Sequence, residues 1–213
     1  MELQVWLAYF LASWAIALSP GSGAVLSMTH GLAYGVQKTS ATIAGLQLGL
    51  AVILLVAGVG VGALLLASAT AFTVVKFAGA GYLIWLGLKQ WRSSVSATVV
   101  SGGHVTAQAG VPSARERFVT GFFTNVTNPK GIVFMVAVLP QFIDPQRSLW
   151  LQLLVLLVTT IGVDLVVMHG YAFLASRAQR WLATARARRA QNRVFGGVLM
   201  AMGASLLLVK RAA

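Results

Sequence analysis

The stretch LSPGSGA (residues 18–24) interrupts an apolar run that extends over residues 5–28. Proline removes a backbone hydrogen-bond donor and clashes with the preceding helical turn, and neighbouring glycines allow the chain to unwind. The sequence therefore predicts a helix that breaks near Pro20. If this run crosses a membrane, the backbone groups freed by the break cannot face lipid and must line a cavity or be buried in protein.

A second stretch of the same kind, TNPKG (residues 127–131), interrupts the apolar run over residues 118–143. Each break opens one half of the chain, and each half has three apolar segments. Because three is odd, the second half is expected to insert upside down relative to the first. Inverted repeats with paired discontinuous helices are typical of secondary transporters, whose site lies where the breaks meet. A simple packing kink at each proline is the alternative that the residues alone leave open.

The composition is that of a membrane protein. Of the 213 residues, 58% are hydrophobic and only 9% are charged, and the mean hydropathy is +0.82. Because a soluble domain has about 25% charged residues, an ordinary soluble enzyme or binding module is excluded. About 20 apolar residues cross a bilayer core, and six segments qualify: residues 5–28, 42–67, 72–88, 118–143, 149–175 and 194–209.

Basic residues are distributed unevenly between the loops. Of the 16 Lys and Arg, 11 lie in the loops after the first, third and fifth segments, and 3 lie on the opposite side. Cytoplasmic loops carry an excess of Lys and Arg. We therefore expect both termini to lie outside a bacterial-type cytoplasmic (inner) membrane. This rule also accounts for the net charge of +12 without a nucleic-acid partner.

A stretch rich in Ser, Gly, Ala and Thr divides the chain in two. We expect residues 93–117 to form a cytoplasmic connector between repeat 1 (about residues 1–92) and repeat 2 (about residues 118–213) of a single transmembrane domain. The basic stretch at residues 176–193 is expected to anchor the topology. Binding of anionic lipid head groups by this stretch is the alternative.

Asp164 lies near the middle of the fifth segment. A charge at this depth costs at least roughly 2.5–3.5 kcal/mol on insertion scales, so an intramembrane acid is a functional hypothesis by default. A carboxyl group there can carry a proton across a transport cycle, and a structural pair with Lys130 or Lys76 is the alternative. Lys130 follows the second break directly and is expected to meet a carboxylate. Gln47 is expected to hydrogen-bond a polar substrate, or else to connect two helices.

Glycines spaced four residues apart indicate helices that approach closely. Gly31 and Gly35 form one such pair, and Gly45 and Gly49 form another. Small residues at this spacing allow two helix backbones to come near each other in a membrane. We interpret both pairs as packing sites.

An intramembrane enzyme would need a nucleophile with its base, or two carboxylates. The Gly-x-Ser-x-Gly elbow is absent, and Asp164 is the only acid well inside a segment. The sequence has no His, Asp and Glu cluster with metal-ligand spacing and no cysteine. A metal site is therefore not expected, whereas an enzyme acting on a lipid or peptide, and a passive channel for small polar solutes, remain as alternatives to a transporter.

The motifs resemble those of the LysE/RhtB family of amino-acid exporters from end to end. The resemblance is carried by LSPGSGA (18–24), IAGLQ (43–47), KFAGAGYLIWLG (76–87), NPKG (128–131) and PQF (140–142). It implies export of small amino acids or their lactones from the cytoplasm, driven by proton exchange, without a cofactor or nucleotide. Many relatives have Pro-Gly-Pro in the first motif; Ser22 stands at its last position here, so it is a candidate for tuning substrate choice.

Taken together, the sequence predicts an all-α integral membrane protein with six transmembrane helices, built as two inverted three-helix repeats in which helices 1 and 4 are broken. The expected partners are an amino acid, protons and membrane lipids, and the oligomeric state stays open. We expect Asp164 to couple transport to protons. The expected substrate-binding residues are Pro20, Gly21, Ser22, Gly23, Gln47, Asn128, Pro129 and Lys130.

Overall fold

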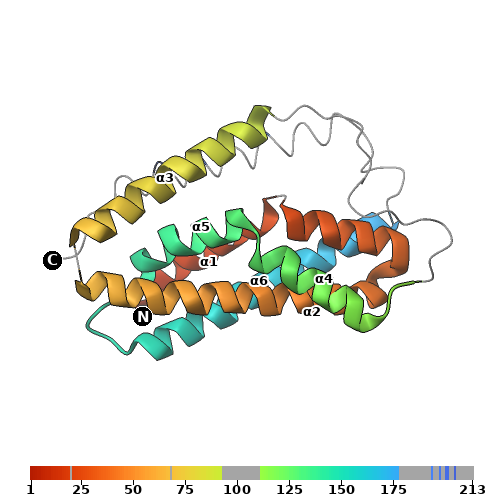
Figure 1. The fold of residues 1–213 in the computed structure, drawn as a ribbon, viewed down its shortest axis with the longest axis horizontal. Coiled ribbons are helices and arrows are strands. Elements are labelled where there is room, and N and C mark those ends of the chain that lie inside the picture. Colours follow the sequence, from red (N-terminus) through yellow and green to blue (C-terminus); the bar gives the residue numbers. More distant parts are fainter. Residues whose placement is uncertain are drawn as a thin grey trace.

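The computed structural model describes residues 1–19, 21–67, 69–92 and 111–177, together with Arg193, Gly197, Met200, Ala201 and Ala204. The secondary structure of these parts is helical and contains no strand (Figure 1). The expected all-α class is thus confirmed, and the first five apolar segments lie in helices. The sixth segment (194–209) lies largely outside the described residues, as does most of the connector. The elements are α1 (Leu3–Leu18), α2 (Ser22–Ala67), α3 (Ala69–Arg92), α4 (Ala114–Val126), α5 (Pro129–Val138), the 3-10 helix η1 (Leu139–Phe142) and α6 (Leu149–Arg177).

The first apolar segment is divided between α1 and α2. Helix α1 ends at Leu18, and Ser19 takes an extended conformation (φ −71°, ψ 120°). Helix α2 begins at Ser22. Pro20 itself lies outside the described residues.

Gly35 divides α2 into two arms that form a hairpin. Its φ of 77° and ψ of 165° are not helical, and a positive φ is strained for any residue with a side chain. The His30 Nδ1 and the Thr42 Oγ1 are 2.7 Å apart, whereas 12 residues of straight helix would span about 18 Å. The chain therefore reverses at Gly35 (Figure 1). The prediction that Gly35 is a packing glycine is not supported, because a Cβ at this position would meet no described residue within 4 Å.

The second interrupted segment consists of α4 and α5. The two helices are bent by 51° between Val126 and Pro129. Helix α4 begins at Ala114, because Ser113 and Glu116 form a capping box in which each side chain accepts a hydrogen bond from the other residue's backbone amide. The last residues of the predicted connector (93–117) therefore lie in α4, and the division of the chain into two repeats stays a prediction.

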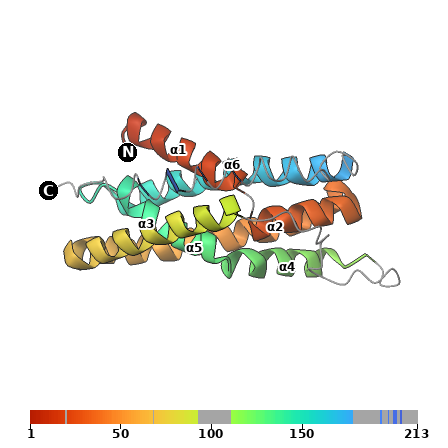
Figure 2. The same cartoon turned by 90° about the horizontal axis from the view of Figure 1, so that it is seen from above.

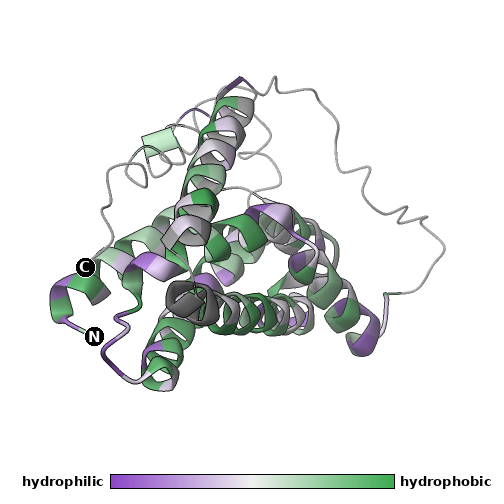
Figure 3. Cartoon of the chain, turned by 60° about the vertical axis from the view of Figure 1, so that its left-hand side comes forward, coloured by the Kyte–Doolittle hydropathy of each residue, from purple (hydrophilic) through white to green (hydrophobic). Residues whose placement is uncertain are grey.

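The outside of the helical bundle is apolar. Large hydrophobic side chains such as Leu11 on α1, Val56 on α2 and Trp150 on α6 are 66–69% exposed. Figure 3 shows apolar residues along the helices and hydrophilic residues gathered near their ends. By length and composition, the ranges Ser22–Gly60, which includes the reversal at Gly35, and Leu149–Arg177 are apolar enough to cross a membrane, and the bent pair α4–α5 is a third candidate. The protein is therefore a multi-pass membrane protein.

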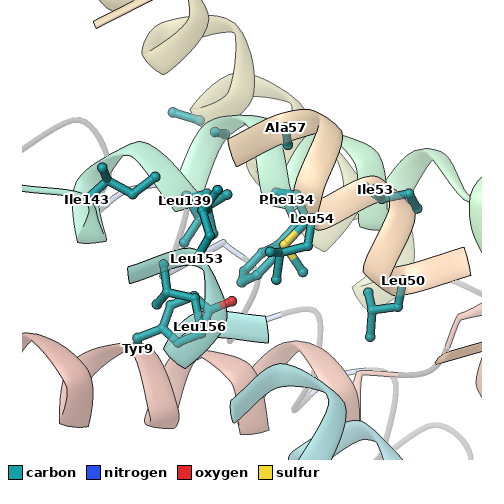
Figure 4. Packing of buried hydrophobic residues seen from close by; sticks show 14 residues of the cluster. Tyr9, Leu50, Ile53, Leu54, Ala57, Phe134, Leu139, Ile143, Leu153 and Leu156 are labelled. Carbon is teal, nitrogen blue, oxygen red and sulfur yellow. The ribbon is translucent and has the colours of Figure 1, made fainter. Parts of the chain in front are cut away.

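The core brings α5 between the other helices. Tyr9 of α1, Leu54 of α2, Phe134 of α5 and Leu156 of α6 are buried in one cluster (Figure 4). The Tyr9 hydroxyl lies 2.5 Å from the Thr160 hydroxyl, which itself donates to the Leu156 carbonyl. Figure 2 shows α1 beside α6, with α4 on the opposite side of α2. This packing holds the interruption after α1 against the interruption before α5.

Candidate functional site

The side chain of Lys130 connects the two interruptions. Its Nζ donates to the Ser19 carbonyl at 2.6 Å and to the Ile16 carbonyl at 3.3 Å. The last carbonyls of an α-helix have no partner within the helix, and the C-terminal end of a helix attracts a cation. The Leu18 carbonyl is bonded in turn by the Tyr171 hydroxyl, at 2.7 Å. The end of α1 is therefore held by side chains from α5 and α6.

Asparagine side chains organise the second interruption. The Asn128 side chain accepts from the Lys130 amide at 3.1 Å and thus caps α5, while Pro129 occupies the first turn, where a missing N–H costs nothing. Asn125, at the end of α4, donates to the Leu46 carbonyl of α2 at 2.7 Å. These bonds fix the direction in which Lys130 leaves the helix.

Asp164 projects from α6 toward α2. The Gln47 Nε2 donates to the Asp164 Oδ2 at 2.6 Å. Gln47 is only 7% exposed, and its other side-chain atom, Oε1, is buried with no hydrogen-bond partner among the described residues. Gln47 therefore positions the carboxylate.

A small cavity lies between these groups. Its volume is about 60 Å³, and since about 10–15 Å³ suffices for one water, it has room for a small polar molecule. Lys130 and Asp164 both line it and attract each other electrostatically. They do not form an ion pair, because both ion pairs found in the described part of the chain involve Arg147. The alternative of a structural pair with Lys130 is thus not observed, and the side chain of Lys76 lies outside the described residues.

The structure brings together part of the predicted site. Of the predicted residues, the cavity is lined by Gly21, Gly23, Asn128, Lys130 and Asp164.

The other predicted residues lie elsewhere. Gln47 lies behind Asp164 rather than at the cavity. Ser22 begins α2, and its hydroxyl donates to the Thr124 carbonyl at 3.5 Å. Pro129 starts α5 without lining the cavity, and Pro20 lies outside the described residues. The roles of all these residues in transport stay predictions.

Sequence reasoning missed several polar residues of the cavity wall. Ser13, Ser19, Asn125 and Thr160 line it as well. Two of these residues, Thr160 and Asn125, could have been predicted from the sequence. Thr160 precedes Asp164 by four residues, so both lie on one face of α6, and Asn125 is an amide within an apolar run. Ser13 could not be singled out, since a serine in a membrane helix usually bonds its own backbone, as Ser13 does to the Tyr9 carbonyl.

Replacing Gln47 with leucine tests its positioning role. We expect Gln47→Leu to lower the rate of transport about tenfold or more, since a hydrogen bond to a charged group contributes about 1.5–3 kcal/mol. The fold should tolerate the change, because the substitution also removes the unpartnered Oε1. The measurement is the initial transport rate per inserted protein. Gln141→Leu is the matched control, because among the described residues Gln141 bonds the Ala137 carbonyl one turn earlier on its own segment. Equal rates for the two variants would contradict the assignment.

An apolar helical bundle in which two interruptions enclose a cavity with separated charges is the architecture of a membrane transporter. Residues 14–210 match the LysE type translocator family. The chain belongs to this family, so it is a transporter and not an enzyme. The resemblance inferred from the motifs is thereby confirmed.

Named relatives extend over most or all of the chain. The chain is 44% identical over 212 residues to the homoserine/homoserine lactone efflux protein of Salmonella typhi, which covers 100% of both chains. The same identity holds for the protein of that name from Salmonella typhimurium. The leucine efflux protein of Enterobacter sp. (strain 638) is 28% identical over 183 residues, covering 85% of this chain and 84% of that protein. No solved structure matches the chain.

Proposed function

We propose that this protein exports small amino acids, namely homoserine, homoserine lactone or a similar compound, from the cytoplasm by exchange with protons. The names of the full-length relatives support the substrate class. The observation that carries the proposal is the cavity wall, where one cation and one anion lie close together without pairing. Homoserine is a zwitterion with one charge of each sign, so it matches such a wall. Homoserine lactone has the ammonium but no carboxylate, and it would meet Lys130 through its ring carbonyl oxygen.

Each end of the substrate has a partner in this arrangement. The carboxylate would bind the Lys130 ammonium at the start of α5, where the helix end also favours an anion. The substrate ammonium would be attracted by Asp164 and by the carbonyls at the end of α1. Apolar residues such as Leu50, Phe134 and Met168 form the rest of the wall. They leave little space for a side chain, which supports small substrates.

Coupling to protons is assigned to Asp164. A carboxyl group in the membrane interior can take up a proton on one side and release it on the other. The interruptions at 19–21 and 127–128 would belong to transmembrane helices 1 and 4 of two inverted repeats, which rock around the site. Both termini would lie outside the cytoplasmic membrane, as the distribution of basic residues favours.

The test is homoserine transport by the purified protein in liposomes. Unlabelled homoserine is placed at equal concentration inside and outside, labelled homoserine is added outside only, and the interior is then made acidic by one pH unit with the membrane potential clamped. Protons leaving the liposomes would drive homoserine inward, and one proton per substrate supports about tenfold accumulation, since each pH unit is worth about 1.4 kcal/mol. Homoserine is used rather than the lactone because a weak base collects in acidic compartments without a carrier. Protein-free liposomes are the control.

The outcome also separates the transporter from a passive channel. A channel would equilibrate the label and never accumulate it. Equilibration without accumulation would thus contradict proton exchange, and no movement of homoserine in liposomes with correctly inserted protein would contradict the substrate assignment.

A further inference from the structure

We infer that the carbonyl end of α1 is a binding site for a primary ammonium group, and that Lys130 occupies it as a built-in substitute when no substrate is bound. This inference rests on the proposed function. It assigns the substrate ammonium to the carbonyls at the end of α1, so that Asp164 does not have to bind both the ammonium and the proton. The substrate's ammonium displaces Lys130 from the carbonyls of Ile16 and Ser19. The freed lysine then pairs with the substrate's carboxylate, while Asp164 is left to handle the proton.

The geometry around the Lys130 Nζ is that of a cation site. It donates to the Ser19 carbonyl at 2.6 Å and to the Ile16 carbonyl at 3.3 Å. Ile16 lies in the last turn of α1 and Ser19 is the residue that follows the helix, so both oxygens lie near the negative end of its dipole. An ammonium has three donors, so one more remains for a third acceptor in the cavity.

Gly21 closes the site on its other side. A Cβ at Gly21 would lie 3.3 Å from the Lys130 Nζ and 3.6 Å from its Cδ. The backbone of the interruption therefore lies close against the lysine side chain, and a side chain at this position would require the ammonium to shift by a few tenths of an ångström. The close approach of Lys130 is thus a reason for glycine at residue 21 that is separate from the break in the helix.

The exchange replaces one charged donor with another. When Lys130 leaves, the Ile16 carbonyl keeps the Ser19 backbone amide at 3.2 Å, but the carbonyls of Ile16 and Ser19 both lose the ammonium that donates to them, and hydrogen bonds from an ionised donor are stronger than neutral ones. A substrate ammonium offers the same chemistry. The carboxylate of the substrate would pair with the displaced Lys130 ammonium. The exchange therefore leaves the net charge of the cavity unchanged. Compounds with a carboxylate but no ammonium would fail to release Lys130.

The experiment refills the site in a variant that lacks the lysine ammonium. Lys130→Ala removes a propylammonium group, so the probe is propylammonium chloride, and the readout is the thermal stability of the purified protein. We expect a saturable rise of a few degrees in Tm for Lys130→Ala and none for the unaltered protein. At ten times the dissociation constant, the ratio of folded to unfolded protein should rise about elevenfold. Potassium chloride and tetramethylammonium chloride at equal ionic strength are the controls, since neither can donate a hydrogen bond.

Lys130→Met is the matched variant. Methionine fills the space of the lysine stem without a charge, so propylammonium should not stabilise this variant. Equal stabilisation of both variants, or none of Lys130→Ala, would overturn the inference.

A second measurement needs no variant and covers the case in which Lys130→Ala does not fold. In liposomes, homoserine should inhibit transport of the label, whereas N-acetylhomoserine and the 2-hydroxy analogue should not. If either analogue inhibited transport as strongly as homoserine does, the ammonium site would be contradicted. The two proposals can fail separately. Stabilisation by propylammonium without homoserine transport would support the ammonium site and contradict homoserine as the substrate. Homoserine transport without stabilisation by propylammonium would support the exporter and contradict the ammonium site.

Discussion

Replacing Asp164 with asparagine is expected to abolish accumulation of homoserine driven by a pH gradient, down to the level of protein-free liposomes. Asparagine has nearly the shape of aspartate, and its side-chain oxygen can still accept from Gln47, which donates to Asp164 at 2.6 Å. It cannot take up a proton at any pH, so the coupled step is lost while the cavity wall is retained. The measurement is accumulation per inserted protein, with insertion checked by extraction and size-exclusion chromatography.

Asp144→Asn is the control for this experiment. Asp144 lies before α6, outside the cavity, and pairs with Arg147 at 3.1 Å on the exposed surface. Exposed ion pairs contribute about 0–1 kcal/mol, so this variant should accumulate homoserine as the unaltered protein does. Normal accumulation by well-inserted Asp164→Asn would remove Asp164 from the coupling mechanism.

The positions of the helices could be predicted from the sequence, because a helix that crosses a membrane needs an apolar segment of about 20 residues. The fifth segment was expected at residues 149–175, and α6 covers Leu149–Arg177. The interruption at 127–131 could also be placed, because proline, glycine and asparagine act on the local backbone. The reversal at Gly35 could not be told from a packing glycine, since both require the absence of a side chain and only the φ of 77° separates them.

The site was only partly predictable, because it depends on the reach and direction of side chains. The sequence predicts that Lys130 sits beside unwound backbone and meets a carboxylate. Its ammonium does lie at the unwound end of α1, 114 residues earlier in the chain, and the meeting with a carboxylate stays a prediction. For Gln47 the sequence leaves open a substrate contact or a bond between two helices; the bond from α2 to Asp164 of α6 is observed, and Gln47 does not line the cavity. Such details follow from helix packing, which periodicity alone does not determine.

The crossing of α2 and α4 is the packing contact in which a single methyl group is expected to have the largest effect on folding. Gly45 of α2 lies directly against α4: an added Cβ would come within 1.9 Å of the Phe118 carbonyl oxygen. The contact is reciprocal, since a Cβ on Gly121 of α4 would lie 2.1 Å from the Thr42 carbonyl oxygen. Each is a clash with backbone, which cannot rotate away as a side chain can.

Gly45→Ala should therefore separate the two helices and destabilise the protein by at least about 3 kcal/mol, the upper part of the range for overpacked sites. Most of the protein should be lost from the folded fraction after extraction. Gly60→Ala makes the same change in the same helix, where an added Cβ would meet none of the described residues within 4 Å. Alanine favours a helix over glycine by about 1 kcal/mol, so Gly60→Ala should be as stable as the unaltered protein or more so. The measurement is the folded yield and Tm of both variants, and a Gly45→Ala protein as stable as Gly60→Ala would show that α2 and α4 do not cross at this distance. Because this crossing carries Asn125 and the start of the second interruption, a small separation there would also displace Lys130 from α1.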